Sequence, residues 1–528
     1  MRLTSQQAGP DALVDEDVRG VRQRCYADRP RDLVGLLEDA LVLSGPAVLL
    51  VDPTLGTTTT YDGFAAAVEG AAQALLSYGL VPGDRVALLV RNGLAAAVAI
   101  WACARAGLLH VGLPADAPPG RIADLLALTT PGLLLVQPDL AAVAREAAGD
   151  VPVADAEQVL LGAPQPWRAG AARPDEDATY CLIATSGTTG HPKAVRVTGR
   201  MAGHAAAFYA RTLGLGPTDR TAVHLPFAWV SGHITQLAPA MLSGGSVVTM
   251  ATFSAAELVR TARVHAATWF DVVPSIFEML LRDSGFALPG LAGVRLAVFG
   301  GAPAPPGTRD RVRERLPQLR LFDVYALSET CAPVTCLPDA EALRRPGSVG
   351  RPVAFCELRL VDPAGAVVAR GQAGEVQVRS PTTTPGYWGT ETSPLLPDGW
   401  LRTGDVGRLD AEGYLYVGGR AVDLIIRGGV NIYPAEVERA LLSSGLLSDA
   451  AVVGVPSRVA GQSVGAAVVA APGATPDTGV LQRAVRDRLG AHAVPRPLRI
   501  VQALPRNRNG KVDRTAVLAM LVPASDPA

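Results

Sequence analysis

A loop rich in glycine and hydroxyl side chains carries a lysine at its end. Residues Thr185–Lys193 read Thr-Ser-Gly-Thr-Thr-Gly-His-Pro-Lys and follow an apolar run, Tyr180–Ala184, that is typical of a strand. Backbone N–H groups and hydroxyls in such a loop can surround phosphate oxygens. The loop is not a Walker motif, because Lys193 follows Pro192 and precedes Ala194. Its composition alone is equally typical of a plain connection, so other residues have to support the phosphate hypothesis.

Two further segments place a carboxylate where a nucleotide needs one. Phe322–Glu329 puts the hydroxyl of Ser328 beside the carboxylate of Glu329 after a predicted strand, which suits a phosphate and its magnesium ion. Trp400–Asp405 predicts a tight turn in which Asp405 accepts hydrogen bonds from two ribose hydroxyls. Either segment alone would be an ordinary surface turn. Their combination with the loop favours a nucleotide.

The use of lysine sets two positions apart. The chain has 48 basic residues, and only Lys193 and Lys511 are lysines. A compact ammonium does what a planar guanidinium cannot, so an arginine-rich chain is expected to keep lysine where the ammonium has a role. Chance is the alternative explanation, since a surface lysine usually has no specific role.

The fold has to position these side chains. The sequence pattern that predicts helices and strands changes along the chain. From about Gly45 to Gly300, β-branched apolar runs alternate with alanine-rich helical patterns, which predicts α/β layers with mostly parallel sheets. Shorter strand patterns past Pro352 predict a β-rich lobe, and a new α+β pattern begins after Gly419. We therefore expect an α/β fold with a large N-terminal domain (1–419) of layered sheets and helices, including the β lobe (353–419), and a small mobile α+β C-terminal domain (420–528).

Composition and charge exclude several classes of binding partner. A chain of 528 residues with 48% hydrophobic content is long enough for two or more cores. Its net charge is −1 without a basic stripe, which argues against nucleic acid and an anionic membrane as partners. The longest apolar stretch, Gly93–Ala104, is shorter than the roughly 18 residues of a membrane span. The N-terminus is polar and acidic, unlike a signal peptide, so a cytoplasmic protein that acts on a small molecule is expected.

The six cysteines indicate neither a disulfide framework nor a zinc motif. They are scattered, with no CxxC pair and no neighbouring histidine at the spacing of a zinc site. This usage fits a reducing cytoplasm.

Five motifs follow one another in a set order: Thr185–Lys193, Tyr325–Glu329, Arg402–Asp405, Gly419-Arg420 and Asn509-Gly-Lys511. In this order and spacing the chain resembles the acyl-adenylate-forming superfamily, which includes acyl-CoA ligases, firefly luciferase and the adenylation domains of peptide synthetases. The resemblance covers nearly the whole chain from position 60 onward. Both lysines fall inside its motifs, so chance is a poor explanation of their rarity.

The resemblance implies residues that bind ATP. The phosphates would meet the loop residues Thr185, Ser186, Gly187, Thr188, Thr189, Gly190 and Lys193, with Thr185 also a candidate for the metal site. Adenine would lie between one segment formed by Gly301, Ala302 and Pro303 and another formed by Asp323, Val324 and Tyr325.

The resemblance also implies catalytic roles. Ser328 would contact the α-phosphate and Glu329 would bind Mg²⁺. Asp405 and Arg420 would hold the ribose. Lys511, at the end of a polar tail loop, would bridge the acid oxygen and the α-phosphate as pyrophosphate leaves.

Two residues of the implied acid pocket differ from the family pattern. Ala326 stands where relatives usually have glycine, and Trp229 stands where many have histidine, so a methyl and an indole reduce the room for the acid. We therefore expect a small or planar acid rather than a long fatty chain. The implied pocket consists of Trp229, Val230, His233, Ala326, Leu327 and Pro333.

The segment Gly428–Glu438 resembles the stand-alone acyl-CoA ligase branch. The leading hypothesis is activation of the acid as acyl-AMP and transfer to a thiol, with coenzyme A favoured over a separate carrier protein. One alternative is a non-thiol acceptor in specialised metabolism, including activation of nitrite to diazotise an aromatic amine. Another is an inactive relative that only binds nucleotide or a partner, but the catalytic residues named above are all present.

The predicted hinge between the domains also departs from the family. Val422 stands where relatives usually have Asp or Lys, with Asp423 as the candidate substitute pivot. In relatives the small domain rotates about this residue after adenylation. A β-branched residue has fewer accessible backbone and χ1 states than aspartate, so we expect either slower rotation or an unusual second half-reaction.

Replacing the hinge residue tests this expectation. We predict that Val422→Asp raises the rate of acyl transfer several-fold and leaves ATP–pyrophosphate exchange unchanged, because only the second step needs the rotation. The two rates are compared at saturating acid and ATP. An unchanged overall rate in Val422→Asp would contradict the hypothesis that Val422 affects the rotation.

Overall fold

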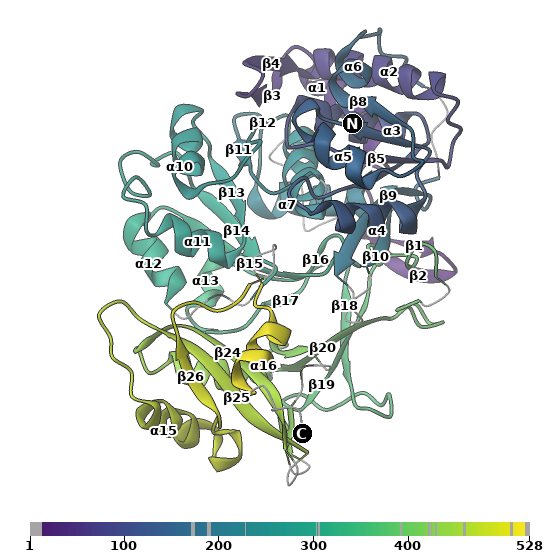
Figure 1. Cartoon of the computed structure of the whole chain (residues 1–528). Coiled ribbons are helices and arrows are strands. Elements are labelled where there is room, and N and C mark those ends of the chain that lie inside the picture. Colours follow the sequence, from purple (N-terminus) through teal and green to yellow (C-terminus); the bar gives the residue numbers. More distant parts are fainter. Residues whose placement is uncertain are drawn as a thin grey trace.

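The computed structural model describes residues 13–170, 175–186, 192–227, 229–302, 304, 307–390, 393–420, 423, 425–427, 430–457, 461–506 and 511–522. Two large sheets with helices between and outside them form the upper part of Figure 1. A four-stranded lobe and a C-terminal α+β unit lie below them (Figure 1).

One large sheet has six strands in the order β10-β9-β6-β5-β7-β8. Its strands are parallel except β10, which pairs antiparallel with β9. Its central strands are short and fully buried, because a parallel sheet is covered on both faces. The strands are β5 (Arg85–Leu89), β6 (Leu109–Gly112), β7 (Leu133–Val136), β8 (Val153–Asp155), β9 (Thr179–Ser186) and β10 (Pro192–Thr198).

The other large sheet has nine strands in the order β17-β16-β15-β14-β13-β11-β12-β3-β4. The strands from β15 to β3 are parallel, whereas β16, β17 and β4 pair antiparallel at the two edges. The strands are β3 (Val48–Asp52), β4 (Thr57–Thr60), β11 (Arg220–Val223), β12 (Ser246–Thr249), β13 (Trp269–Val272), β14 (Leu296–Gly300), β15 (Arg320–Ala326), β16 (Pro333–Leu337) and β17 (Arg351–Pro352).

One hydrophobic core fills the layer between these sheets. The Trp101 and Phe64 rings meet edge to face at 5.8 Å in its centre, and the Trp101 indole N–H donates to the Leu33 carbonyl at 3.0 Å. The layer contains α1 (Leu33–Ser44), α2 (Tyr61–Ser77), α3 (Leu94–Arg105), α7 (Gly199–Leu213), the π-helical turn η2 (His233–Leu237) and α9 (Ala238–Leu242).

Further helices cover the outer faces of the two sheets. On the nine-stranded sheet these are α10 (Ala255–Val264), α11 (Pro274–Leu280) and α12 (Thr308–Arg315), and on the six-stranded sheet they are α4 (Pro119–Thr129) and α5 (Ala141–Ala147). The smaller elements are β1 (Leu13–Val18), β2 (Val21–Tyr26), η1 (Pro138–Leu140), α6 (Ala156–Leu161), α8 (Val230–Gly232) and α13 (Asp339–Ala342).

The β lobe and the C-terminal unit each form a separate sheet. The lobe is antiparallel, with β18 (Glu357–Val361), β19 (Ala373–Arg379), β20 (Leu401–Leu409) and β21 (Leu415–Arg420). The predicted domain boundary at 419/420 falls at the end of β21. The C-terminal unit contains β22 (Ile425–Arg427), β23 (Val430–Ile432), α14 (Pro434–Leu442), β24 (Leu447–Ser457), β25 (Gly461–Ala470), α15 (Thr478–Leu489), η4 (Ala491–Ala493), β26 (Leu498–Val501) and α16 (Arg514–Leu521).

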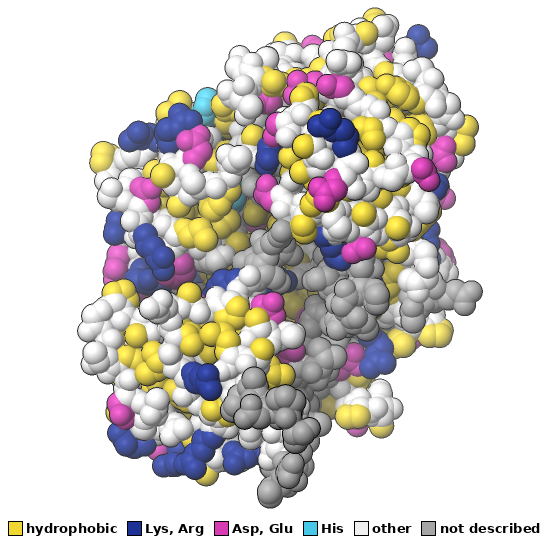
Figure 2. All heavy atoms as spheres, viewed as in Figure 1, with side chains coloured by type: hydrophobic (Ala, Val, Ile, Leu, Met, Phe, Trp, Pro, Cys, Tyr) yellow, Lys and Arg dark blue, Asp and Glu magenta, His cyan; other side chains and the backbone are white. Residues whose placement is uncertain are grey.

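The predicted fold class is confirmed: the sheets are mixed or parallel, helices cover them, and a small α+β unit ends the chain. None of the described helices is long and apolar enough to cross a membrane. Figure 2 shows basic and acidic side chains distributed over both the upper and the lower part of one face. This distribution agrees with the small net charge of −1.

The chain segment at Pro30 crosses α7 at very close range. A Cβ atom added at Gly203 of α7 would lie 2.0 Å from the carbonyl oxygen of Pro30. Backbone cannot give way as the end of a side chain can, so only glycine fits at this crossing. The crossing therefore fixes α7 within the central layer.

The two glycines Gly203 and Gly120 make a matched pair for a stability test. We expect Gly203→Ala to cost about 1–3 kcal/mol and to lower the apparent Tm, because the backbone at Pro30 has to shift. Gly120→Ala in α4 meets nothing within 4 Å. It should be neutral or stabilising by up to about 1 kcal/mol through helix propensity. Thermal unfolding of both variants makes the comparison, and equal midpoints would contradict the tight crossing.

Candidate active site

The predicted adenine-binding segments lie at the carboxyl ends of two neighbouring parallel strands. Val324 of β15 stands opposite Gly300 of β14, and a Cβ at Gly300 would lie 2.4 Å from the Val324 carbonyl oxygen. Gly301 follows with a positive φ of 79°, so the chain turns away sharply after β14. Ligands of open α/β sheets bind at this edge. Ala302 continues this turn, and Pro303 lies outside the described residues.

The carboxylate of Asp323 already has a partner in the protein. Arg309 of α12 donates to it at 2.6 Å and to Asp339 at 2.7 Å. Burial raises the pKa of Asp323 to about 6, and the charge of Arg309 opposes this rise. Arg309 therefore holds the end of β15 in place. The sequence analysis missed Arg309, because α12 carries several arginines and nothing in their spacing singles one out.

The hydroxyl of Tyr325 joins the nine-stranded sheet to the β lobe. It donates to the buried Asp405 carboxylate at 2.5 Å. Arg420 stands directly opposite Asp405 in the pairing of β20 with β21. The two residues predicted to bind ribose are therefore cross-strand neighbours, and Tyr325 joins Asp405 to the end of β15 that carries the predicted adenine segment.

The tight turn predicted at Trp400–Asp405 is wrong, because Asp405 lies within strand β20. Arg402 stands opposite Gln377 and Val406 stands opposite Glu375, so three residues of β20 face one residue of β19. Gly404 has a positive φ of 71° inside this bulge. The turn-like sequence thus produces an irregular strand, and the bulge directs Asp405 toward Tyr325.

Lys193 lies at the start of β10, opposite Thr185 of β9. Both side chains are half-buried, and the Thr185 hydroxyl donates to the Lys193 carbonyl at 3.5 Å. Ser186 ends β9, and Gly187, Thr188, Thr189 and Gly190 lie outside the described residues. The antiparallel pairing therefore brings the two ends of the predicted phosphate loop together.

Tyr387 connects this lysine to the predicted magnesium ligand. The Lys193 ammonium lies 4.9 Å from the centre of the Tyr387 ring, a cation–π contact. The Tyr387 hydroxyl donates to Glu329 Oε1 at 2.9 Å. The Tyr387 ring therefore lies between the lysine predicted to bind phosphate and the carboxylate predicted to bind the metal ion. The sequence analysis missed Tyr387, and its only signal was an aromatic pair, Tyr387-Trp388, after a run of threonines.

Backbone hydrogen bonds fix the segment that carries Tyr387. The Thr384 N–H donates to the Glu329 carbonyl at 2.7 Å, and the Trp388 N–H donates to the Ala194 carbonyl at 2.8 Å. The segment is thereby bound both to the turn after β15 and to β10.

A short turn between β15 and β16 presents Ser328 and Glu329. The Thr330 hydroxyl accepts from the Leu327 N–H at 3.2 Å, and Cys331 adopts a positive φ of 59° that closes the turn. Ala326 ends β15 and Pro333 begins β16, so the predicted pocket residues Ala326, Leu327 and Pro333 surround this turn.

Trp229 and Val230, predicted to line the acid pocket, are half-buried at the start of α8. His233 behind them is fully buried, and its Nδ1 lies 3.0 Å from the carbonyl oxygens of both Phe227 and Trp229. The imidazole therefore supports the Trp229 turn from inside the protein.

Lys511 is exposed, next to a β-bridge between Arg506 and Val512. Val422, the predicted hinge, lies outside the described residues. Asp423 pairs with Arg514 of α16 at 3.5 Å. Asp423 is therefore attached to the C-terminal unit that carries Lys511.

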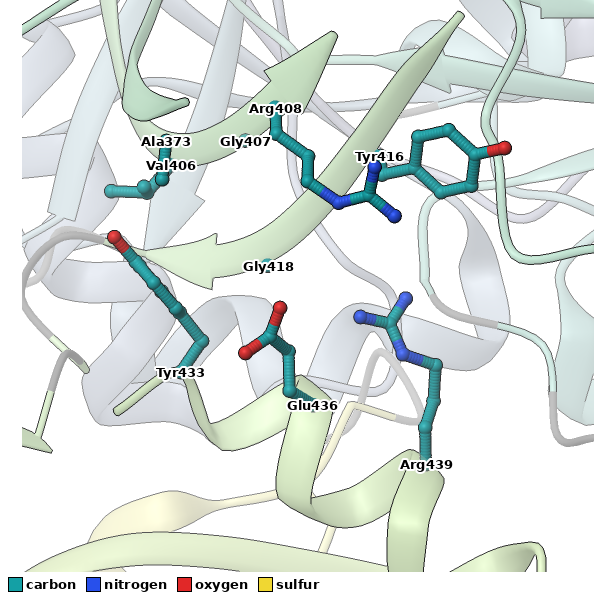
Figure 3. A pocket seen from close by; sticks show the side chains of 9 residues that line it. All are labelled: Ala373, Val406, Gly407, Arg408, Tyr416, Gly418, Tyr433, Glu436 and Arg439. Atoms are coloured by element: carbon teal, nitrogen blue, oxygen red, sulfur yellow. The ribbon is translucent and has the colours of Figure 1, made fainter. Parts of the chain in front are cut away.

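A cleft separates the C-terminal unit from the β lobe (Figure 3). Arg408 of β20 and Arg439 of α14 face one another across it (Figure 3). Glu436 lies between this arginine pair and Tyr433. A Cβ at Gly418 of β21 would lie 3.4 Å from the Tyr433 ring, so the two units touch here. The cleft is lined by Ala373, Val406, Gly407, Arg408, Tyr416, Gly418, Tyr433, Glu436 and Arg439.

Known families match both parts of the chain. The family model described as AMP-binding enzyme matches residues 40–388, and that of the AMP-binding enzyme C-terminal domain matches residues 436–511. The chain belongs to the AMP-binding enzyme family. This AMP-binding enzyme is 34% identical to the sulfoacetate–CoA ligase of Cupriavidus necator over 481 residues, which is 89% of this chain and 94% of that protein.

Solved structures resemble the AMP-binding enzyme over most of its length. The o-succinylbenzoate coenzyme A synthetase of Bacillus subtilis, in complex with its acyl-adenylate intermediate, has a TM-score of 0.82 at 29% identity and covers 93% of this chain and 98% of its own. The amide bond synthetase McbA from Marinactinospora thermotolerans has a TM-score of 0.83 at 30% identity, with coverages of 92% and 99%. The family match and the ligase relatives confirm the predicted superfamily and the predicted enzyme class, an AMP-forming acid–thiol ligase.

Removing the Tyr387 hydroxyl tests the link to Glu329. We expect Tyr387→Phe to weaken adenylation roughly 10-fold to 100-fold, because a hydrogen bond to a charged group contributes about 1.5–3 kcal/mol. ATP–pyrophosphate exchange measured over a range of magnesium concentrations provides the readout, and the loss should be largest at low magnesium.

Two further variants separate the hydroxyl from the ring. Tyr387→Leu should lose more activity than Tyr387→Phe, because it also removes the ring beside Lys193. Tyr78→Phe, at an exposed tyrosine, should behave as the unmodified protein. An unaltered magnesium dependence in Tyr387→Phe would show that this hydroxyl does not position Glu329.

Proposed function

We propose that this AMP-binding enzyme activates a small or planar carboxylic acid with MgATP and transfers the acyl group to coenzyme A. The observation that carries the proposal is the arrangement around the end of β15. Tyr325 holds the ribose carboxylate Asp405 on one side, and Tyr387 holds Glu329 beside Lys193 on the other.

The first step forms the acyl adenylate. One acid oxygen attacks the α-phosphorus of ATP, the bond to the β-phosphate oxygen breaks in line, and pyrophosphate leaves. Negative charge grows on the α-phosphate oxygens, so preorganised positive groups are needed there. Glu329 offers an oxygen ligand of the kind that Mg²⁺ prefers, and the ion would neutralise phosphate charge. Lys511 is our candidate for the cation that meets the acid oxygen and the α-phosphate.

The second step transfers the acyl group. The sulfur of coenzyme A attacks the acyl carbon, the bond to AMP breaks, and the thiol loses its proton as the thioester forms. The separate cores of the C-terminal unit support a role for its movement between the two steps, because no residue of the large domain belongs to them. A separate carrier protein as the thiol remains an expectation of the sequence analysis.

The substrate proposal rests on the residues around the Trp229 turn. The indole of Trp229 and the methyl of Ala326 reduce the space for an acyl chain. Sulfoacetate, named for one relative, is a short acid, and o-succinylbenzoate, named for another, carries an aromatic ring, whereas a third relative is named as a long-chain fatty acid–CoA ligase. We propose that this chain also accepts short or planar acids and discriminates against long fatty chains.

A second candidate acceptor is an amine. The observation that favours it is the structural similarity to an amide bond synthetase, at a TM-score of 0.83 and 30% identity. In that case the activated acid would form an amide, and coenzyme A would not be required.

A panel of acids distinguishes these functions. Pyrophosphate release is measured with short acids, planar aryl acids, a long fatty acid and nitrite, each with and without coenzyme A. The proposal expects release with short or planar acids, and thioester formation when coenzyme A is present. Amide formation without coenzyme A would support the second candidate. Activity with the long fatty acid alone would contradict the substrate proposal.

Lys511→Ala tests the proposed cation. We expect it to lower ATP–pyrophosphate exchange by roughly 10²–10³-fold, as the loss of one preorganised donor does elsewhere. Lys511→Arg should also be impaired, because a planar guanidinium cannot take the place of a compact ammonium. Arg499→Ala, at an exposed cation on β26 of the same unit, is the matched control. Intact exchange in Lys511→Ala would overturn the assignment.

A further inference from the structure

Three metal-ligating side chains from distant parts of the sequence meet inside the molecule. The ligand atoms of His110, Cys181 and His233 lie within 4.8 Å of one another, and all three residues are buried. None of them belongs to the groups proposed to bind ATP. Such a cluster has no counterpart in the spacing of cysteines along the sequence.

The backbone positions two of the three ligands. β6 and β9 are parallel neighbours, and His110 stands directly opposite Cys181 in their pairing. Side chains opposite one another on adjacent strands share one face of the sheet. Here that face meets the central helical layer, in which the π-helical turn η2 begins with His233.

His233 has the hydrogen bonding expected of a histidine ligand. Its Nδ1 lies 3.0 Å from the carbonyl oxygens of Phe227 and Trp229, which can only accept, so Nδ1 carries the proton. Nε2 then keeps its lone pair, and it lies 3.4 Å from the Tyr180 hydroxyl. Histidines that bind metals are typically oriented in this way, by a carbonyl at the other ring nitrogen.

His110 lacks the partners that a buried imidazole normally has. It is 1% exposed, and neither ring nitrogen meets hydrogen-bond geometry with a described residue, although the Tyr180 backbone lies beside the ring. Buried polar atoms without a partner are rare, so each one calls for an explanation.

We propose that His110, Cys181 and His233 bind one zinc ion. Two imidazoles and a thiolate are typical zinc ligands, and a water molecule would complete the tetrahedron. With zinc–nitrogen bonds of about 2.0 Å and a zinc–sulfur bond of about 2.3 Å, neighbouring ligand atoms lie roughly 3.3–3.5 Å apart. The three side chains would close by about 1 Å. The Cys181 thiol loses its proton when the zinc–sulfur bond forms, so one proton is released per ion.

The site would act on the acid pocket through His233. Its imidazole holds the carbonyl of Trp229, and zinc would fix that imidazole to two strands of the six-stranded sheet. Resting on the proposed function, this predicts that removal of zinc raises the KM for the acid several-fold and leaves the KM for ATP unchanged. His233 is thus a positioning residue.

Metal content and cobalt spectroscopy test the site without reference to activity. The full chain, purified without a histidine tag or chelator, should retain about one zinc per chain. Cobalt-substituted protein should show a sulfur-to-cobalt charge-transfer band. Cys181→Ser should lose this band, and both Cys181→Ser and His110→Asn should weaken zinc binding by at least roughly 10²-fold.

Cys356→Ser is the matched control, since Cys356 is also a buried free cysteine and its thiol contacts the Glu357 carbonyl at 3.5 Å. It should keep both the zinc and the cobalt band. If a variant fails to fold, removal of zinc from the unmodified protein still tests the site. Stripping its zinc should lower the apparent Tm, and zinc but not magnesium should restore it with release of about one proton per ion.

The absence of a cobalt–thiolate band in the unmodified protein, or an identical band in Cys181→Ser, would overturn the proposal. A protein that binds zinc at this site but activates no acid would disprove the proposed function and leave the metal site intact.

Discussion

The hydrogen bond from Tyr325 to Asp405 holds the two halves of the nucleotide site together. A buried carboxylate without a donor costs about 1–3 kcal/mol or more, so Asp405 has to be paired when the lobe packs on the sheet. Tyr325 comes from the end of β15, whereas Asp405 comes from a bulge in β20. Glu329 and Tyr387 repeat the arrangement on the phosphate side. The groups proposed to bind ribose and magnesium are thus both positioned by one strand, β15. A displacement of the carboxyl end of this strand would disturb both groups.

The C-terminal unit is stabilised by hydrophobic cores of its own. Its two small cores contain residues from Ile425 onward and none from the large domain. The salt bridge between Asp423 and Arg514 attaches the start of the unit to α16, so residues on both sides of Lys511 belong to one body. Glu438 also contacts Arg514, at 3.1 Å, and burial raises its pKa. A unit with its own cores suits an enzyme whose proposed catalytic lysine has to leave after the first step.

The central layer between the two large sheets has a different constraint, because polar groups buried there cannot reach water. His233 meets this constraint with two backbone carbonyls, and the same contacts shape the Trp229 turn at the acid pocket. Neither ring nitrogen of His110 makes such a hydrogen bond with a described residue. A metal ion would satisfy both imidazoles at once. The layer that stabilises the large domain would then also set the shape of the acid pocket.

The sequence by itself determined the features that depend on neighbouring residues. The turn with Ser328 and Glu329, the helix from Pro434 and the alternation of strands and helices all depend on short segments, so local pattern and a family resemblance were enough to predict them. The turn predicted at Asp405 failed because pairing with β19 overrides local turn preference in the middle of a sheet. Only the tertiary structure brought Tyr387 to Glu329, Arg309 to Asp323, and His110 to Cys181 and His233. These contacts join residues far apart in the chain, and strand order and register, which depend on the whole core, decide which of them meet.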